Sequence, residues 1–269
     1  MTLLPAIRYF AVSHIGLRRS RNEDSYAIYD FGESRPPANR RGVLFVLADG
    51  IGGHACGDLA SKMACQGLTT FFDDCTAGFE AKQYAQRLDD LIFSVDSRIR
   101  QHAVTHPDCT DMGTTLSALL ISGNFAVTAH VGDSRIYRLR GERLTQLTTD
   151  HSFVQEMIDE GELTPEAAIK HPFRSVLTRA VGTQESLEEV EIRTEDASLG
   201  DRFLLCSDGL HDMVSFEEIA VTLKDGIDPR QSAEQLLNAA LRNGGRDNVT
   251  IISILLSSPE PNEKCIKKR

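Results

Sequence analysis

Four short apolar stretches between residues 114 and 147 are separated by polar turns of only two or three residues. The stretches cover 114–121, 125–131, 134–140 and 143–147. Connections this short join neighbouring antiparallel strands, whereas parallel neighbours need long crossovers. This segment therefore predicts an antiparallel meander and argues against a doubly wound parallel sheet.

The rest of the chain adds further strands and two pairs of helices. Strand-like stretches lie at 7–14, 25–30, 43–48, 190–193, 202–206 and 249–256, and helical patterns lie at about 55–72, 83–104, 216–223 and 229–242. Apolar residues recur every three or four positions in the second helical pattern, which is typical of a helix with one core-facing side. Because strands outnumber helices and connect locally, we predict an α+β fold with helices covering antiparallel sheets.

Length and composition favour one folded unit. We predict a single domain over 1–258, followed by a basic tail at 259–269. The net charge of -10 argues against a sequence-independent nucleic-acid binder, which needs a basic surface. No apolar run reaches membrane-spanning length, and we predict a cytoplasmic protein.

The cysteines show neither a CxxC pair nor a zinc-binding spacing, and several lie inside apolar runs. We therefore predict that all of them are reduced thiols: Cys56, Cys65, Cys75, Cys109, Cys206 and Cys265.

Three aspartates share one local pattern, a strand of buried character joined to a tight turn. The stretches at 43–48 and 202–206 run into Asp49-Gly50 and Asp208-Gly209, and Asp247 precedes the stretch at 249–256. A single Asp-Gly pair after a strand is typical of a simple turn. Three such positions together predict carboxylates that meet at one rim of the sheets.

Carboxylates crowded together resist ionising side by side unless cations stabilise them. Ligand sets made only of oxygen favour Mn²⁺ or Mg²⁺ over Zn²⁺. Two such ions roughly 3.5 to 4 Å apart acidify a bridging water and clamp a phosphoryl group. The loop at 18–24, RRSRNED, is either a solvated charged loop or a source of a guanidinium for phosphate beside acidic groups.

Eight motifs occur in one order along nearly the whole chain: GLRRSRNEDS at 16–25, LADGIGGHACGDLAS at 47–61, MGTTLSALLI at 112–121, AHVGDSRIYRLR at 129–140, LTTDHSFVQEMIDEGELTPEAA at 147–168, SVLTRAVG at 175–182, LLCSDGLHDMV at 204–214 and GRDNVTII at 245–252. With these motifs the chain resembles the metal-dependent protein phosphatase family, the type 2C serine/threonine phosphatases, in its compact bacterial form. The resemblance implies a four-layer α-β-β-α sandwich of two packed antiparallel sheets flanked by helices. It also implies that the segment at about 151–182 is a flap beside the active site, either a mobile substrate contact or a rigid lobe.

The resemblance implies a metal-binding set: Asp49, Gly50, Asp208, Asp247, Glu23, Asp24 and Asp133. Asp49 is expected to bridge two Mn²⁺ or Mg²⁺ ions, and the Gly50 carbonyl to bind one of them. Asp208 and Asp247 complete the other site. Glu23 and Asp24 act mostly through coordinated waters, and Asp133 with Asp208 holds a third, weaker ion.

Further roles follow from the same motifs. Arg19 occupies the phosphate-binding position and forms the catalytic set with Asp49 and Asp208, while Arg18 and Arg21 are less well aligned. Thr114 and Asn248 look like structural support near the rim.

One position departs from the family pattern and leaves the general acid unassigned. Some eukaryotic relatives carry a histidine directly after the Asp-Gly pair, where this chain has Ile51. We predict that a metal-bound water protonates the leaving group, and that His54, His151 and His171 serve the structure of the loop and the flap.

The predicted function is direct, metal-dependent hydrolysis of phosphoserine and phosphothreonine on proteins, which reverses a bacterial Ser/Thr kinase. The predicted partners are those phosphoproteins and that kinase, with no nucleic acid and no membrane, and the protein is predicted to be a monomer. A phosphatase-like binding or regulatory domain is the alternative; it would lack a metal aspartate, and none is missing. This chain lacks the Gly-Lys-Ser/Thr signature of a nucleotide-binding protein, which argues against that class. The sequence does not distinguish a protein phosphatase from a small-molecule phosphoesterase.

Overall fold

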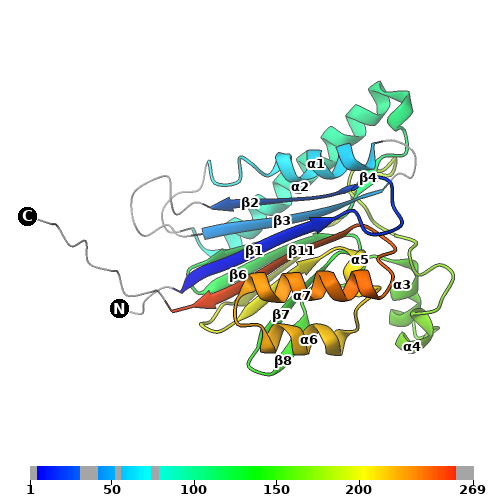
Figure 1. The fold of residues 1–269 in the computed structure, drawn as a ribbon. Helices are drawn as coiled ribbons and strands as arrows, with labels where there is room; N and C mark the ends of the chain where they lie inside the picture. Colours follow the sequence, from blue (N-terminus) through cyan, green and yellow to red (C-terminus); the bar gives the residue numbers. More distant parts are fainter. Residues whose placement is uncertain (1–4, 31–41, 52–55, 74–78, 259–269) are drawn as a thin grey trace, which may run out of the picture.

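The computed structural model describes residues 5–30, 42–51, 56–73 and 79–258, and its strands form two antiparallel sheets (Figure 1). The first sheet has the order β1-β11-β10-β7-β8: β1 (Ala6–His14), β11 (Val249–Ser257), β10 (Arg202–Cys206), β7 (Arg135–Arg140) and β8 (Arg143–Gln146). The second sheet has the order β2-β3-β5-β6-β9: β2 (Asp24–Asp30), β3 (Gly42–Ile51), β5 (Leu116–Ser122), β6 (Phe125–Val131) and β9 (Glu191–Asp196). A short strand, β4 (Gly113–Thr114), pairs with the end of β3.

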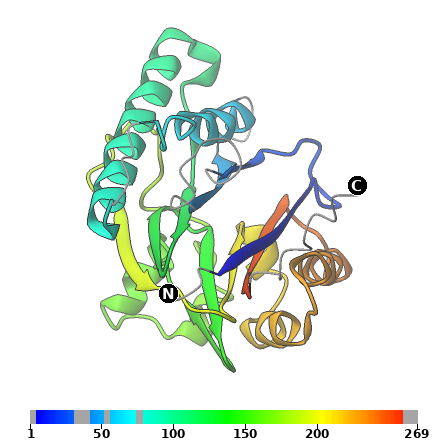
Figure 2. The same ribbon diagram turned by 90° about the vertical axis from the view of Figure 1, so that its left-hand side faces the viewer.

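Two helix pairs enclose the sheets. Helices α1 (Gly57–Gly67) and α2 (Ala81–Thr105) pack on the second sheet, and α6 (Phe216–Asp225) and α7 (Pro229–Arg242) pack on the first (Figure 2). The predicted α+β fold, a sandwich of two antiparallel sheets between helices, is confirmed. None of the helices in the described part of the chain is long and apolar enough to cross a membrane.

Strand β3 shows why this chain makes four layers. Leu44 and Val46 point into the core shared with α1 and α2, while Phe45 and Leu47 point into the core between the two sheets. Both faces of the strand are buried, so its sequence is continuously apolar instead of alternating. The rim of the sheets therefore rests on a strand that is buried on both faces and that carries Asp49 near its end.

The flap segment carries α3 (Phe153–Asp159) and α4 (Pro165–Ala168), in agreement with the helical turns that its sequence indicates. Two further single turns were not predicted: η1 (Pro107–Cys109) and α5 (Asp208–His211). The predicted tail at 259–269 lies outside the described residues.

The prediction that all cysteines are reduced is wrong for one pair. Cys56 and Cys109 form a disulfide, with their Cα atoms 5.5 Å apart and their positions 53 apart in sequence. Pairing of β3 with β4 brings the two positions together, and sequence spacing does not display that contact. Cys65 and Cys206 are free and buried.

Candidate metal centre

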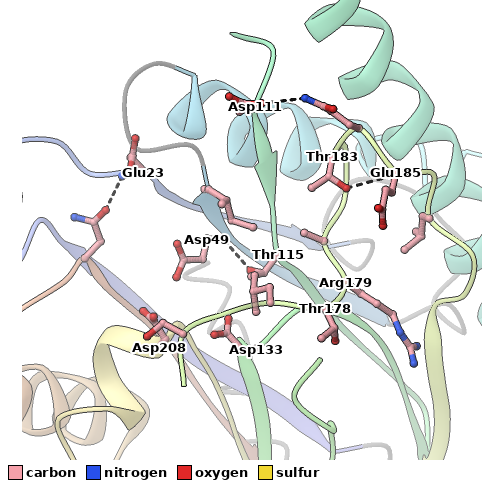
Figure 3. A pocket seen from close by; sticks show the side chains of 18 of the residues that line it. Glu23, Asp49, Asp111, Thr115, Asp133, Thr178, Arg179, Thr183, Glu185 and Asp208 are labelled. Carbon is pink, nitrogen blue, oxygen red and sulfur yellow. Dashed lines mark hydrogen bonds between the residues drawn. The ribbon is translucent and has the colours of Figure 1, made fainter. Parts of the chain in front are cut away.

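Five aspartates from different elements gather at one end of the sheets, and Figure 3 shows three of them, Asp49, Asp133 and Asp208. Asp24 and Asp49 face each other across β2 and β3, Asp133 lies between β6 and β7, Asp208 begins α5, and Asp247 precedes β11. All except Asp24 line a cleft of about 1450 Å³, together with three other predicted site residues, Arg19, Glu23 and Gly50. The chain therefore brings its predicted site residues to one place.

The local geometry of two aspartates differs from the prediction. Strand β3 continues through Asp49 and Gly50 to Ile51, so no tight turn follows Asp49. Asp208 is the first residue of α5 and does not lie in a turn after β10. The strand continues because β4 supplies it with a further partner beyond the reach of β5.

Burial dominates the electrostatics of this cluster. Loss of solvation raises the pKa of Asp49 and Asp208 well above its usual value, and neighbouring carboxylates raise it further. Burial also raises the pKa of Asp133 to about 7 and that of Asp24 to about 6. These carboxylates need protons or cations to be stable together.

The donor set fits hard divalent cations. One oxygen of Asp24 and one of Asp208 are buried without a hydrogen-bond partner, although Ser207 Oγ donates to the other oxygen of Asp24 at 2.8 Å. A buried, unpartnered carboxylate oxygen costs free energy unless something binds it. Oxygen ligands in this number suit Mn²⁺ or Mg²⁺.

Two threonines fix the backbone of Asp49. The Asp49 N–H donates to Thr115 Oγ1 at 2.9 Å, and the Asp49 carbonyl accepts from Thr115 N at 2.8 Å and from Thr114 Oγ1 at 2.8 Å. Thr115 Oγ1 also lies 2.8 Å from Ser134 Oγ. The support role expected of Thr114 agrees with these contacts, whereas Thr115 was not singled out because its partner is 66 residues away in sequence.

Gly50 is required by packing. A Cβ at this position would lie 2.2 Å from the carbonyl oxygen of Gly57 and 2.7 Å from that of Glu23. No side chain fits such an approach, so the glycine lets the start of α1 and the loop after β1 close on the strand end.

Asn248 ties the loop after β1 to the start of β11. Its Oδ1 accepts from Glu23 N at 2.8 Å, and its Nδ2 donates to the carbonyls of Ile15 and Arg21, each at 2.9 Å. All three bonds reach residues more than 220 positions away in sequence. The support role expected of Asn248 thus has a structural basis.

Arg19 lies at the mouth of the cleft. Its Nη2 donates to Asp247 Oδ2 at 2.6 Å, and its side chain is 48% exposed. Arg18 and Arg21 do not line the cleft. Arg19 is therefore the arginine of the loop that is placed to meet an anionic ligand.

Comparison with known proteins places this cleft in a family. The family model described as protein phosphatase 2C matches residues 19–243. The chain belongs to the protein phosphatase 2C family. The serine/threonine protein phosphatase PstP of Mycobacterium tuberculosis is 43% identical over 91% of this chain, and the chain spans 44% of that relative's length.

One further relative and one solved structure match this chain over nearly their whole length. Serine/threonine phosphatase stp of Listeria innocua is 35% identical over 89% of this chain and 92% of its own length. A crystal structure of the catalytic domain of PstP in complex with two manganese ions matches with a TM-score of 0.78 and 40% identity, covering 94% of this chain and 99% of that one.

The histidines considered as acids in this phosphatase 2C chain have structural contacts. His54 lies outside the described residues. His151 is buried, accepts at Nδ1 from Gly132 N at 3.1 Å, and donates its own N–H to the Gly132 carbonyl at 2.7 Å. His171 Nδ1 accepts from Phe173 N at 3.3 Å inside the flap. Neither His151 nor His171 lines the aspartate cleft.

A second group of potential metal ligands lies under the flap. The ligand atoms of His130, His151 and Glu191 lie within 4.8 Å of one another. Both ring nitrogens of His130 are already engaged, with Ser117 Oγ and the Gly132 carbonyl, each at 2.9 Å. This group therefore forms a hydrogen-bonded support beneath the turn before Asp133.

The wall of the cleft extends beyond the predicted flap. Leu177 forms an isolated bridge with Ser152 at the base of α3. Thr178, Arg179, Thr183 and Glu185 come from the segment that follows and flank the cleft (Figure 3). Residues up to 189 line the same cleft, so the segment beside the cleft extends past residue 182, where the predicted flap ends.

Proposed function

We propose that this chain is a metal-dependent serine/threonine protein phosphatase that hydrolyses phosphoserine and phosphothreonine on proteins. The observation that carries the proposal is the cleft in which buried carboxylates with unpartnered oxygens lie beside Arg19. Membership of the protein phosphatase 2C family supports it. A catalytically weak binding domain is not favoured, because every expected metal aspartate is present.

The proposed centre takes two Mn²⁺ or Mg²⁺ ions, as the manganese-bound PstP domain does. Asp49 would be shared between the two ions, Gly50 would contribute its carbonyl, and Asp208 and Asp247 would complete the set. Glu23 and Asp24 would act through water, and Asp133 would serve a third, weaker ion. When bound, the cations acidify a water for direct attack and neutralise charge on the phosphoryl oxygens.

The chain's own residues orient the substrate. Arg19 forks onto the phosphoryl oxygens, and Asp247 holds its guanidinium at the mouth of the cleft. Ile51 donates no proton, so the leaving alkoxide takes its proton from water in the cleft. The segment from Ser175 to Glu189 forms the wall against which the flanking peptide lies.

The wider setting follows from this chemistry. The proposed partner is a bacterial Ser/Thr kinase that makes the phosphoproteins, and a cytoplasmic location is proposed because ATP-dependent kinases act there. We propose that the enzyme acts as a monomer through one catalytic domain at 1–258, with 259–269 as a tail.

The test is hydrolysis of a phosphothreonine peptide with Mn²⁺, with EDTA, and with Mn²⁺ in the Asp208→Asn variant. We expect turnover in the first arm only, and wild-type turnover in Asp225→Asn, which removes an exposed carboxylate at the end of α6. Comparison of kcat/KM with p-nitrophenyl phosphate separates a protein phosphatase from a small-molecule esterase. Turnover in EDTA, or full activity in Asp208→Asn, would sink the proposal.

A further inference from the structure

Two cysteines are joined directly behind the strand end that carries Asp49 and Gly50. Beyond Asp49, β3 pairs with β4 through Gly50 opposite Thr114 and Ile51 opposite Gly113. Further along both segments, Cys56 and Cys109 form the disulfide. The covalent bond therefore links the chain shortly after β3 to the chain shortly before β4.

The conformation of Cys56 depends on its surroundings. Its φ is 88°, in the left-handed region, and it is the one non-glycine residue with a positive φ among the residues that the structure describes. A side chain in this region is strained and persists only where neighbouring structure enforces it. Cys56 is also the N-cap of α1, and the next residue, Gly57, is in direct contact with Gly50.

We propose that Cys56 and Cys109 are a thiol–disulfide exchange site, and that the redox state of this pair sets how firmly the chain holds cations at Asp49 and Gly50. The inference goes beyond phosphatase activity, since it concerns the stability and cation affinity of the protein. The exchange partners are low-molecular-weight disulfides and dithiols. In a reducing compartment, disulfides of this kind are transient and sense the redox state.

The chemistry balances as two successive exchanges. A dithiol attacks through one thiolate at the Cys56 sulfur, since Cys56 is the more exposed residue of the pair, and the Cys109 thiolate leaves with the electron pair. The second thiol of the reagent then displaces Cys56, so the protein gains two electrons and two protons, and the reagent becomes a disulfide. Oxidation by a low-molecular-weight disulfide runs the same two steps in reverse.

The other described cysteines do not compete. Cys65 and Cys206 are buried, and loss of solvation raises the pKa of each to about 12. Exchange requires a thiolate and access. In contrast, Cys56 lies partly exposed at the N-terminus of an 11-residue helix, where a thiolate is stabilised.

Loss of the bond should loosen the strand end. Releasing a link between positions 53 residues apart should lower the thermal midpoint by roughly 7 °C. The dissociation constant for Mn²⁺ should rise roughly tenfold. This is the lower end of the range expected when a group that supports the metal ligands is lost.

The experiment uses the full chain, equilibrated with oxidised glutathione or with dithiothreitol, in the wild type and in the Cys56→Ser/Cys109→Ser variant. Iodoacetamide labelling and peptide mass mapping show whether Cys56 and Cys109 are linked. Thermal unfolding gives the midpoint, and Mn²⁺ titration gives the dissociation constant. We expect the Cys56–Cys109 peptide pair only in oxidised wild type, and a midpoint and Mn²⁺ shift with dithiothreitol that the variant lacks.

The idea is overturned if both cysteines are alkylated after oxidation, or if dithiothreitol shifts the variant as much as the wild type. It is also overturned if the linked pair forms and breaks while the midpoint and the Mn²⁺ dissociation constant stay unchanged. Failure of every form to bind Mn²⁺ would overturn the proposed function as well, while the peptide map and the midpoint would still report the exchange.

Discussion

Replacement of Asn248 by alanine probes how the rim of the cleft is held. Asn248→Ala removes three hydrogen bonds, to Glu23 N and to the carbonyls of Ile15 and Arg21. At about 1 kcal/mol each, their loss lowers the free energy of unfolding by about 3 kcal/mol. The unfolding entropy of a 269-residue chain is about 0.6 kcal/mol per kelvin, so the thermal midpoint falls by about 5 °C.

The same bonds place Glu23 and the loop that carries Arg19, so the variant should also bind Mn²⁺ about 10- to 100-fold more weakly. Differential scanning calorimetry and Mn²⁺ titration measure the two effects. Asn243→Ala is the matched control, since that side chain makes a single exposed hydrogen bond, to the Met213 carbonyl, and its loss should shift the midpoint by about 2 °C or less. An Asn248→Ala protein that melts and binds Mn²⁺ like Asn243→Ala would refute the reasoning.

Three other changes have defined outcomes. Gly50→Ala should lower the free energy of unfolding in urea titrations by about 1–3 kcal/mol or more, because its Cβ would lie 2.2 Å from a backbone oxygen. The control is Gly42→Ala in the same strand, where the Cβ would meet nothing closer than 3.5 Å and the free energy of unfolding should change little. Arg19→Ala should raise KM for a phosphothreonine peptide about 10- to 100-fold in steady-state kinetics, through loss of a charge-assisted contact, and an equal rise in Arg18→Ala would contradict the assignment. Burial raises the pKa of Asp133 from 3.8 to about 7, so between these values the metal-free folded protein binds more protons than the unfolded chain. The free energy of unfolding in EDTA should therefore fall as pH rises from about 4 to 7, and Asp133→Asn should weaken this pH dependence.

Local sequence patterns were enough to predict most helices and strands of this fold. The helix predicted near 229–242 coincides with α7, which begins at Pro229 after Asp228, whose side chain accepts from Gln231 N. The short turns of the meander likewise determined antiparallel pairing. Both signals lie within a few residues of the structure they predict.

The features that were missed depend on contacts distant in sequence. Asp49 does not end its strand, because β4 pairs with β3 from more than 60 residues further on. The Cys56–Cys109 bond follows from the same pairing. The gathering of the aspartates was expected from their strand context and the family resemblance, but the bonds of Thr115 that support them have no local signature.

The most direct test of the metal centre is the number of Mn²⁺ ions bound, measured by electron paramagnetic resonance titration of the wild type and of Asp208→Asn near neutral pH. The cluster predicts two tightly bound ions per wild-type chain and the loss of at least one of them in the variant, with the fold retained by circular dichroism. Wild-type protein that binds no Mn²⁺, or an Asp208→Asn chain that binds two ions with wild-type affinity, would contradict it.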